Sequence, residues 1–273
     1  MKMLNKEFYY LNGQIMPSED AKIHVSDLAL LRGYGIFDFF RAIKGKPIFI
    51  EDHLDRFENS AKLMGLTIPE SRKRLLEIIM ELIRMNPYEL LGIKMILTGG
   101  YSPDGYNPAE KSNLIMIARP FVFKDPARGI KLMSCEYQRE IPEVKTLSYI
   151  TPVRLLPKMR SIGADDYLYY YNGFISESSR SNIFIVKDQK VITPKTGFLP
   201  GVTRKHVMEA CRGAFYLEER DVTLAETLAA DEVFTTSSTQ RVIAITQIDD
   251  HVFGDGQIGP VTKKLQELLL KEE

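Results

Sequence analysis

Turn signals divide this chain into short apolar segments, and their placement limits the folds that it can adopt. Asn12-Gly13 and Lys44-Gly45-Lys46 each stand between two apolar runs. Glycine-containing turns of this kind favour a tight reversal between antiparallel strands. The runs on either side are residues 8–11, 14–16, 35–43 and 47–50. The first fifty residues therefore predict an antiparallel sheet.

Two helices are predicted to follow. Asp52 can cap the first helix, which we expect to end near Gly65, and Ser71 can cap the second. Apolar residues recur at helical spacing in both segments: Leu54, Phe57, Ala61 and Met64 in the first, and Leu75, Ile78, Ile79, Leu82 and Ile83 in the second. Such a stripe marks the buried face of a helix. We therefore expect both helices to cover the sheet.

The second half of the chain mixes strands and helices without strict alternation. The expected strands are residues 130–135, 166–171, 174–176, 182–186, 191–193, 232–236 and 242–245, with helices at 152–162, at 202–212 and at the C-terminus. This order favours an α+β fold or a closed mixed sheet. Two prolines and a glycine within residues 120–129 are typical of a connector. We predict an N-terminal α+β domain over 1–119, this connector, and a C-terminal domain over 130–273.

Composition excludes several classes of function. The chain has 36 basic and 36 acidic residues, so it lacks the charge excess typical of proteins that bind nucleic acid or anionic membranes. Cys135 and Cys211 are far apart, and the four histidines form no ligand spacing, so neither a metal knuckle nor a redox motif is indicated. The N-terminal segment resembles no leader, and no apolar run is long enough to span a membrane. We expect a reduced, metal-free cytoplasmic protein.

Lys145 and Glu177 are the strongest candidates for catalysis. A lysine beside Thr146 and Leu147 can be desolvated enough to lose its proton and attack an aldehyde. Glu177 follows an Asn-Gly turn and a short apolar strand, where its carboxylate can face a ring nitrogen. Each residue alone is more often a solvated surface charge. The pair matters because an imine-forming lysine and a carboxylate are what pyridoxal phosphate chemistry needs.

Three segments offer donors for a phosphate. Leu199-Pro200-Gly201 precedes a helix, so the amides of Val202 and Thr203 are available at its N-terminus. Hydroxyls cluster in 235–240, including Ser238 and Thr239, and hydroxyl donors suit a phosphate without net charge. Arg56, on the first helix, carries a guanidinium fork that can clamp phosphate oxygens. Taken singly, each of these features can be explained without a phosphate, as an ordinary turn, a polar loop or a solvated helix face.

Together and in this order, these residues resemble the cofactor constellation of the class IV aminotransferases, the fold type IV pyridoxal phosphate enzymes. Residues 53–56, 145–149, 177–184 and 199–204 are similar to the family's His-x-Asp-Arg helix, Lys-Thr-Leu-Asn-Tyr loop, Glu-x-x-x-x-Asn-x-Phe strand and Leu-x-Gly-x-Thr-Arg turn. Ser148 departs from the family, which commonly has Asn there. The resemblance spans nearly the whole chain and implies an N-terminal α/β sandwich-like domain and a C-terminal mixed pseudo-barrel.

The resemblance also implies roles for individual residues. Lys145 would anchor pyridoxal 5′-phosphate as an imine and shuttle a proton, and Tyr149 would donate to the cofactor's phenolic oxygen. Glu177 would keep the pyridine nitrogen protonated. The phosphate would be held by Arg56, Gly201, Val202, Thr203, Ser238 and Thr239. The family further implies a homodimer.

The substrate pocket departs from the family's better-known patterns. Thr98-Gly99-Gly100-Tyr101 stands where D-amino-acid transaminases carry Arg-Gly after a Thr, and where branched-chain enzymes carry Tyr-x-Arg. A substrate carboxylate then needs another cation, because burying it unpaired is costly. The candidate substrate contacts are Arg32, Phe37, Lys94 and Arg180, with Arg41 a further spare cation. Surface ion pairs are an equal explanation of Arg32 and Arg180.

Three functions remain open from the sequence. Asp38 lies in Gly35-Ile36-Phe37-Asp38, where transaminases of the family carry Glu and aminodeoxychorismate lyases tend to carry Thr, so an acidic residue favours transamination. Displaced arginines resemble those of some D-amino-acid transaminases of the family, and this resemblance favours a D-amino acid, while two pocket arginines suit a 2-oxo acid such as 2-oxoglutarate. A branched-chain L-amino-acid aminotransferase and an aminodeoxychorismate lyase are the alternatives. A plain binding module with a solvated Lys145 is a further class, which absence of a visible cofactor band would favour.

Overall fold

The computed structural model describes residues 7–123 and 125–273, which form two compact units. Unit 1 comprises residues up to Val122 together with Val144–Ser148, and unit 2 comprises Phe123–Glu143 and Tyr149–Glu273. The predicted connector, 120–129, overlaps the first boundary, and its Lys124 lies outside the described residues. The assignment of Val144–Ser148 to unit 1 differs from a single division of the chain. None of the described helices is both long and apolar enough to cross a membrane.

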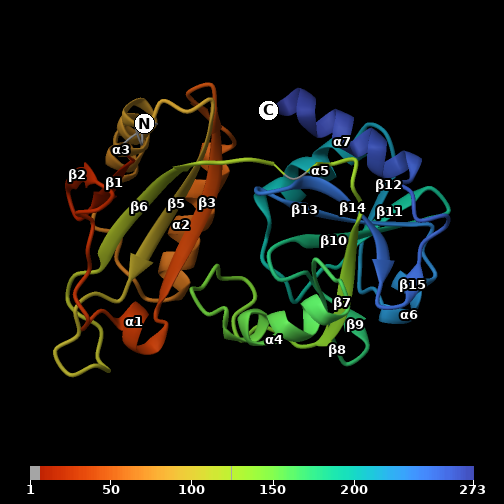
Figure 1. Ribbon diagram of the computed structural model, residues 1–273, viewed down its shortest axis with the longest axis horizontal. Helices are drawn as coiled ribbons and strands as arrows, with labels where there is room; N and C mark the ends of the chain where they lie inside the picture. Colours follow the sequence, from red (N-terminus) through yellow and green to blue (C-terminus); the bar gives the residue numbers. More distant parts are fainter. Residues whose placement is uncertain (1–6, 124) are drawn as a thin grey trace. The chain divides into compact units, whose positions relative to one another are not determined.

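Unit 1 contains the predicted antiparallel sheet, with strands in the order β2-β1-β6-β5-β3-β4 (Figure 1). Its elements are β1 (Phe8–Leu11), β2 (Gln14–Pro17), α1 (Leu28–Arg32), β3 (Gly35–Ile43), β4 (Lys46–Pro47), α2 (Ile50–Leu63), α3 (Arg72–Met85), β5 (Leu90–Thr98) and β6 (Asn113–Pro120). Apolar side chains of α2 and α3 share one buried cluster with alternate residues of β3, β5 and β6. The helices therefore cover one face of the sheet, as predicted.

Helix α2 begins earlier than predicted. Phe49 is its N-cap residue, with a left-handed φ of 53°, and Asp52 lies within the first turn. The predicted strand at 47–50 is correspondingly short, because β4 ends at Pro47. Asp52 still suits its place, since acidic side chains in a first turn are stabilised by the helix dipole. Ser71 does cap α3, accepting a hydrogen bond from Arg74 N at 3.2 Å.

Unit 2 contains a nine-stranded mixed sheet together with helices of different lengths. Its elements are β7 (Ile130–Glu136), α4 (Ile150–Ser161), β8 (Asp166–Tyr171), β9 (Phe174–Ile175), β10 (Asn182–Lys187), β11 (Lys190–Thr193), α5 (Val202–Arg212), β12 (Tyr216–Glu219), α6 (Leu224–Leu228), β13 (Glu232–Ser237), β14 (Arg241–Ile248), β15 (His251–Val252) and α7 (Pro260–Glu272). The strand order is β12-β11-β10-β13-β14-β7-β8-β9, with β15 paired to β14.

This sheet closes on itself. β9 ends the strand order at one side, yet Ile175 N donates to Val222 O at 2.9 Å, and Phe174 bridges Thr223. Val222 and Thr223 come shortly after β12, the strand at the other side. Isoleucine, leucine and valine side chains from β7, β10, β13 and β14 fill the enclosed interior. The closed mixed sheet matches the predicted pseudo-barrel, in which paired edges leave fewer unpaired backbone groups.

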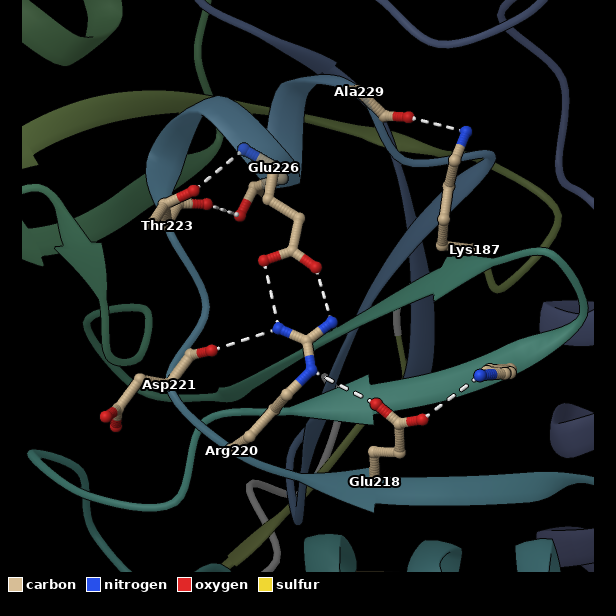
Figure 2. A network of polar contacts seen from close by, with 9 residues as sticks. Lys187, Glu218, Arg220, Asp221, Thr223, Glu226 and Ala229 are labelled. Atoms are coloured by element: carbon tan, nitrogen blue, oxygen red, sulfur yellow. Dashed lines mark hydrogen bonds and ion pairs between the residues drawn. The ribbon is translucent and has the colours of Figure 1, made fainter.

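A polar network holds in place the segment that contains Val222 and Thr223, which pairs with β9 (Figure 2). Thr223 caps α6, since its Oγ1 accepts a hydrogen bond from Glu226 N at 3.0 Å. The Glu226 carboxylate binds the Arg220 guanidinium, whose Nε also donates to Glu218 on β12 at 3.1 Å. Arg220 therefore ties the end of β12 to α6, next to the backbone bonds that close the sheet.

Candidate active site

Strand pairing in unit 1 fixes the position of Lys145. Phe37 N donates to Lys145 O at 2.9 Å, and Leu147 N donates to Gly35 O at 3.0 Å. The segment Val144–Ser148 thus extends the sheet as a short partner of β3. Residues opposite each other in such a pair share a face, and the Lys145 Nζ lies 4.6 Å from the centroid of the Phe37 ring. The candidate lysine is held through its backbone, while its half-buried side chain lies on an aromatic ring.

Lys94 lies on the same ring from the other side of β3. It belongs to β5, diagonal to Phe37, and its Nζ is 4.9 Å from the ring centroid. Burial, helped by the charge of Arg119, lowers the pKa of Lys94. Among the residues that the structure describes, no carboxylate is paired with this ammonium group. Lys94 is therefore a half-buried cation on the same aromatic ring as the candidate catalytic lysine, and a cation of this kind can bind a substrate carboxylate.

Arg56 lies on α2, over the helix-covered face of the sheet. Its Nε and Nη2 each donate at 2.8 Å to the carboxylate of Asp38, which is fully buried. His53 Nδ1 lies 2.7 Å from the same carboxylate. Burial raises the pKa of Asp38, but Arg56 and His53 outweigh burial and hold that pKa well below its usual range. Asp38 is thus an ionised acceptor shared by two side chains of α2.

Glu177 is clamped in unit 2 by a donor at each oxygen. Arg139 Nε donates to Oε1 at 2.7 Å, and Leu199 N donates to Oε2 at 3.0 Å. The carboxylate is buried and follows β9, whose neighbour β8 carries Tyr169, the donor to Glu177 O. Arg139 was not predicted, because nothing in the local sequence around 139 points to a glutamate 38 positions later. Two donors favour the ionised carboxylate.

Tyr149 and Arg180 share the electrostatic surroundings of Glu177. Burial is the largest influence on Tyr149 and raises the pKa of its phenol, while Arg139 and Arg180 act against burial. The phenol therefore remains a hydrogen-bond donor at neutral pH. Arg180 is 59% exposed, and its Nη2 is 3.9 Å from Asp166 Oδ2, a loose ion pair. Such an exposed pair contributes little to stability, so the guanidinium can reorient at low cost.

The predicted phosphate turn is shaped by Asn182. Its Nδ2 donates to Leu199 O at 2.8 Å, and its Oδ1 occupies the space where a side chain at Gly201 would begin. Asn182 pairs across the sheet with Thr236, near the end of β13, and Ser238 and Thr239 follow in the next turn. The two predicted phosphate segments of unit 2 are therefore tied to the same pair of strands.

Arg204 stabilises the loop before this turn. The guanidinium donates to Pro194 O and to Glu219, both at 3.0 Å, and lies 4.4 Å from the centroid of the Phe198 ring. Burial lowers the pKa of Arg204, and Glu219 acts against burial. The arginine of the Leu-x-Gly-x-Thr-Arg motif therefore stabilises the loop formed by residues 194–199.

Gly201→Ala is expected to destabilise unit 2. A Cβ at this position would lie 2.0 Å from Asn182 Oδ1, so the carboxamide or the turn must move. Overpacking of this kind costs about 1–3 kcal/mol, measurable as a lower free energy of unfolding in urea. Gly213→Ala, at the other end of α5, is the matched control, because a Cβ there meets nothing within 4 Å. Equal stabilities of the two variants would contradict this account of the turn.

The remaining predicted residue, Arg32, ends α1. It is exposed, and its Nη1 donates to Leu31 O at 3.1 Å. Unit 1 therefore brings together Lys145, Phe37 and Lys94, with Arg56 held by Asp38. Unit 2 brings together Glu177, Tyr149 and Arg180, and ties the turn 201–203 to the strand that leads to 238–239.

These residues fit pyridoxal phosphate chemically. The N-terminus of α5 offers amides of Val202 and Thr203 that precede the helix's own hydrogen bonds. Near Asn182, the hydroxyls of Thr236 and Ser178 are buried and have no hydrogen-bond partner among the described residues. A buried hydroxyl without a partner is rare unless a ligand or water serves it. Lys145 supplies the amine, and Glu177 supplies an ionised carboxylate.

Comparison with known proteins gives a consistent result. Residues 35–248 match the family model for amino-transferase class IV. The branched-chain-amino-acid aminotransferase of Pseudomonas aeruginosa is 30% identical, over 94% of this chain and 90% of its own. The D-alanine aminotransferase of Bacillus licheniformis is 28% identical, over 94% and 95%.

Among solved structures, the T.th. branched-chain amino acid aminotransferase complexed with N-(5′-phosphopyridoxyl)-L-glutamate is also similar. It aligns with a TM-score of 0.91 and 26% identity, over 97% of this chain and 93% of that one. The family match covers most of both units. The chain therefore belongs to the class IV aminotransferase family and is a pyridoxal-phosphate-dependent transaminase.

Proposed function

We propose that the protein transfers an amino group between a D-amino acid and a 2-oxo acid such as 2-oxoglutarate. The observation that carries this proposal is the row Lys145–Phe37–Lys94, in which two ammonium groups share one aromatic ring. Lys94 has no carboxylate partner among the described residues, and its ammonium group lies on the same ring as the side chain of Lys145. This supports a substrate whose carboxylate binds beside the lysine.

The bound cofactor supplies an aldehyde and an electron-withdrawing ring. In the proposal, Lys145 would hold the cofactor through its Nζ and, when the substrate amine takes its place, would move a proton at the substrate's α-carbon. Glu177, fixed by Arg139 and Leu199 N, keeps a proton on the pyridine nitrogen. Tyr149 donates to the phenolic oxygen, which its raised pKa supports.

In this proposal the phosphate is held by one side-chain charge, by backbone amides and by hydroxyls. Arg56 provides the charge. The amides are those of Gly201, Val202 and Thr203, and the hydroxyls are those of Ser238 and Thr239. Only one of these groups is charged, and helix-terminal amides and hydroxyls complete the set, which is a common way to bind a phosphate.

Substrate contacts are assigned to Lys94, Phe37, Arg32 and Arg180. Arg180 is well suited to bind a carboxylate, because its pair with Asp166 is loose and its guanidinium is largely exposed. The two arginines of this set, Arg32 and Arg180, suit dicarboxylic partners such as glutamate and 2-oxoglutarate.

Arg180→Ala is expected to raise the KM for the amino acid by about 10-fold or more, the usual effect of losing a charge-assisted hydrogen bond. The dissociation constant of the cofactor should change by less than about 2-fold, because a substrate contact is not needed to hold the cofactor. Arg212→Ala, an exposed arginine at the end of α5, is the control for losing a surface charge. An unchanged KM in Arg180→Ala would remove Arg180 from the pocket.

A panel of D- and L-amino acids with 2-oxoglutarate tests the proposed substrate. We expect D-amino acids to be converted. The half-reactions are monitored by the loss of the cofactor's visible absorption band. A preference for L-leucine, L-isoleucine and L-valine would establish the branched-chain alternative, which the names of several relatives favour. Release of pyruvate from aminodeoxychorismate, without conversion of any donor, would establish a lyase.

A homodimer in the cytoplasm is also proposed. Val25, Leu30 and Leu31 are exposed on and near α1, and exposed apolar side chains of this kind favour association with a second copy. Arg32 follows them directly, so it can serve the partner's substrate site. Both cysteines are free, which suits a reducing compartment. A monomer by light scattering at working concentration would exclude the dimer.

A further inference from the structure

We propose that Asp38 is a positioning residue that orients the guanidinium of Arg56 toward the cofactor phosphate. The inference rests on the proposed role of Arg56. It gives Asp38 a structural role, which is different from its use above as an indicator of transamination rather than lyase activity. The side chain lies on the face of the sheet that α2 covers, whereas the neighbouring Phe37 faces Lys145. Asp38 therefore contacts side chains of α2 and faces away from Lys145.

The contact between Asp38 and Arg56 fixes one edge of the guanidinium. Nε donates to Oδ2 and Nη2 donates to Oδ1, each at 2.8 Å. A two-point contact of this kind sets the plane of the fork as well as its distance. Because the contact uses the edge formed by Nε and Nη2, the carboxylate also determines where Nη1 points. A lysine at position 56 cannot make the same two-point contact.

Other groups hold Asp38 itself in place. Oδ1 also accepts a hydrogen bond from Phe39 N at 2.7 Å, and His53 Nδ1 lies at 2.7 Å. An ionised carboxylate only accepts hydrogen bonds, so Nδ1 of His53 must carry a proton. Burial lowers the pKa of His53, which keeps the ring neutral with its proton on Nδ1. Asp38 is 0% and His53 2% exposed, so neither side chain has room to rotate.

A comparison of two cofactor forms tests this positioning role. Apo protein is titrated with pyridoxal phosphate and, separately, with pyridoxal, which lacks the phosphate, and the ratio of the two dissociation constants is the readout. Asp38→Asn is expected to weaken binding of pyridoxal phosphate by about 10-fold to 100-fold, as loss of a supporting partner typically does. Binding of pyridoxal should change by less than about 2-fold. A general loss of folding would affect both ligands alike, so an equal loss for both overturns the proposal.

Further variants separate this inference from the proposed function. Arg56→Ala must show the phosphate-selective loss; if it does not, Arg56 does not hold the phosphate and the proposed function is wrong at that point. In the Arg56→Ala background, Asp38→Asn should add nothing, and an additional selective loss would show that Asp38 acts by another route. Asp38→Glu should recover most of the selectivity, since it keeps the carboxylate; failure to recover it would count against the proposal.

Two variants guard against misfolding and simple charge effects. If Asp38→Asn does not fold, Arg56→Lys gives the same answer, because it keeps the charge but loses the fork. A phosphate-selective loss in Arg56→Lys similar to that in Arg56→Ala supports orientation by Asp38, whereas normal binding overturns it. Asp55→Asn is the matched control, an exposed acid of α2 that pairs with Arg72 and should leave both dissociation constants unchanged.

Discussion

Lys145→Ala is expected to abolish the visible absorption band of the bound cofactor and to lower kcat by about 10⁴-fold, because in the proposed function this one residue both anchors the cofactor and moves the proton. Among the described residues of unit 1, no other lysine lies on a segment like Val144–Ser148, which pairs with β3 although it comes much later in the chain. Lys158→Ala, in the last turn of α4, is the control and should leave the band and the turnover unchanged.

Lys94 makes a direct test necessary, since its Nζ lies on the same ring as that of Lys145. Borohydride reduction of the holoenzyme, followed by peptide mass mapping, shows which lysine carries the cofactor. The expected product is a modified peptide that contains Lys145. A modified Lys94 would show that the two lysines have the opposite roles.

Glu177→Gln is expected to lower kcat by about 10²-fold to 10³-fold, the usual effect of removing one charge aimed at a developing charge. Arg139 Nε and Leu199 N donate to different oxygens of this carboxylate. A carboxamide has one acceptor oxygen and cannot serve both, so the variant also loses a hydrogen bond. The cofactor should remain attached through Lys145, so the visible band persists while turnover falls.

The control for this variant is Glu226→Gln. Glu226 is also bound by an arginine, Arg220, but it belongs to the network that secures α6 (Figure 2). Its loss should lower the free energy of unfolding slightly and leave kcat unchanged. Normal turnover in Glu177→Gln would mean that the pyridine nitrogen needs no carboxylate at this position.

Local signals in the sequence were sufficient for much of the fold. The boundaries of β3 and α5 agree with the prediction because each is marked by its own neighbours: a glycine-containing turn after Ile43, and Pro200-Gly201 before Val202. The predicted start of α2 was wrong, because the N-cap residue of this helix is Phe49, whose side chain cannot cap a helix. A backbone conformation, rather than a recognisable side chain, begins that helix.

Contacts between distant segments were beyond reach from the sequence. The pairing of Val144–Ser148 with β3 joins residues about a hundred positions apart, and no local periodicity marks such a short partner strand. Arg139 and Asp38 were invisible as supports for Glu177 and Arg56 for the same reason. Candidate site residues could be proposed from the sequence because they resemble family motifs, whereas the residues that support them depend on tertiary packing.

The path of the chain has a consequence for taking the protein apart. Val144–Ser148 belongs to unit 1, yet the residues on either side of it belong to unit 2. A fragment ending at Val122 would lack the strand that covers part of one edge of β3, and that bare edge would invite aggregation. A fragment starting at Phe123 would carry the candidate catalytic lysine, Lys145, on a segment with no sheet to join. Neither half is therefore expected to be exchangeable as a module, and chimaeras of related enzymes should take both units from one parent.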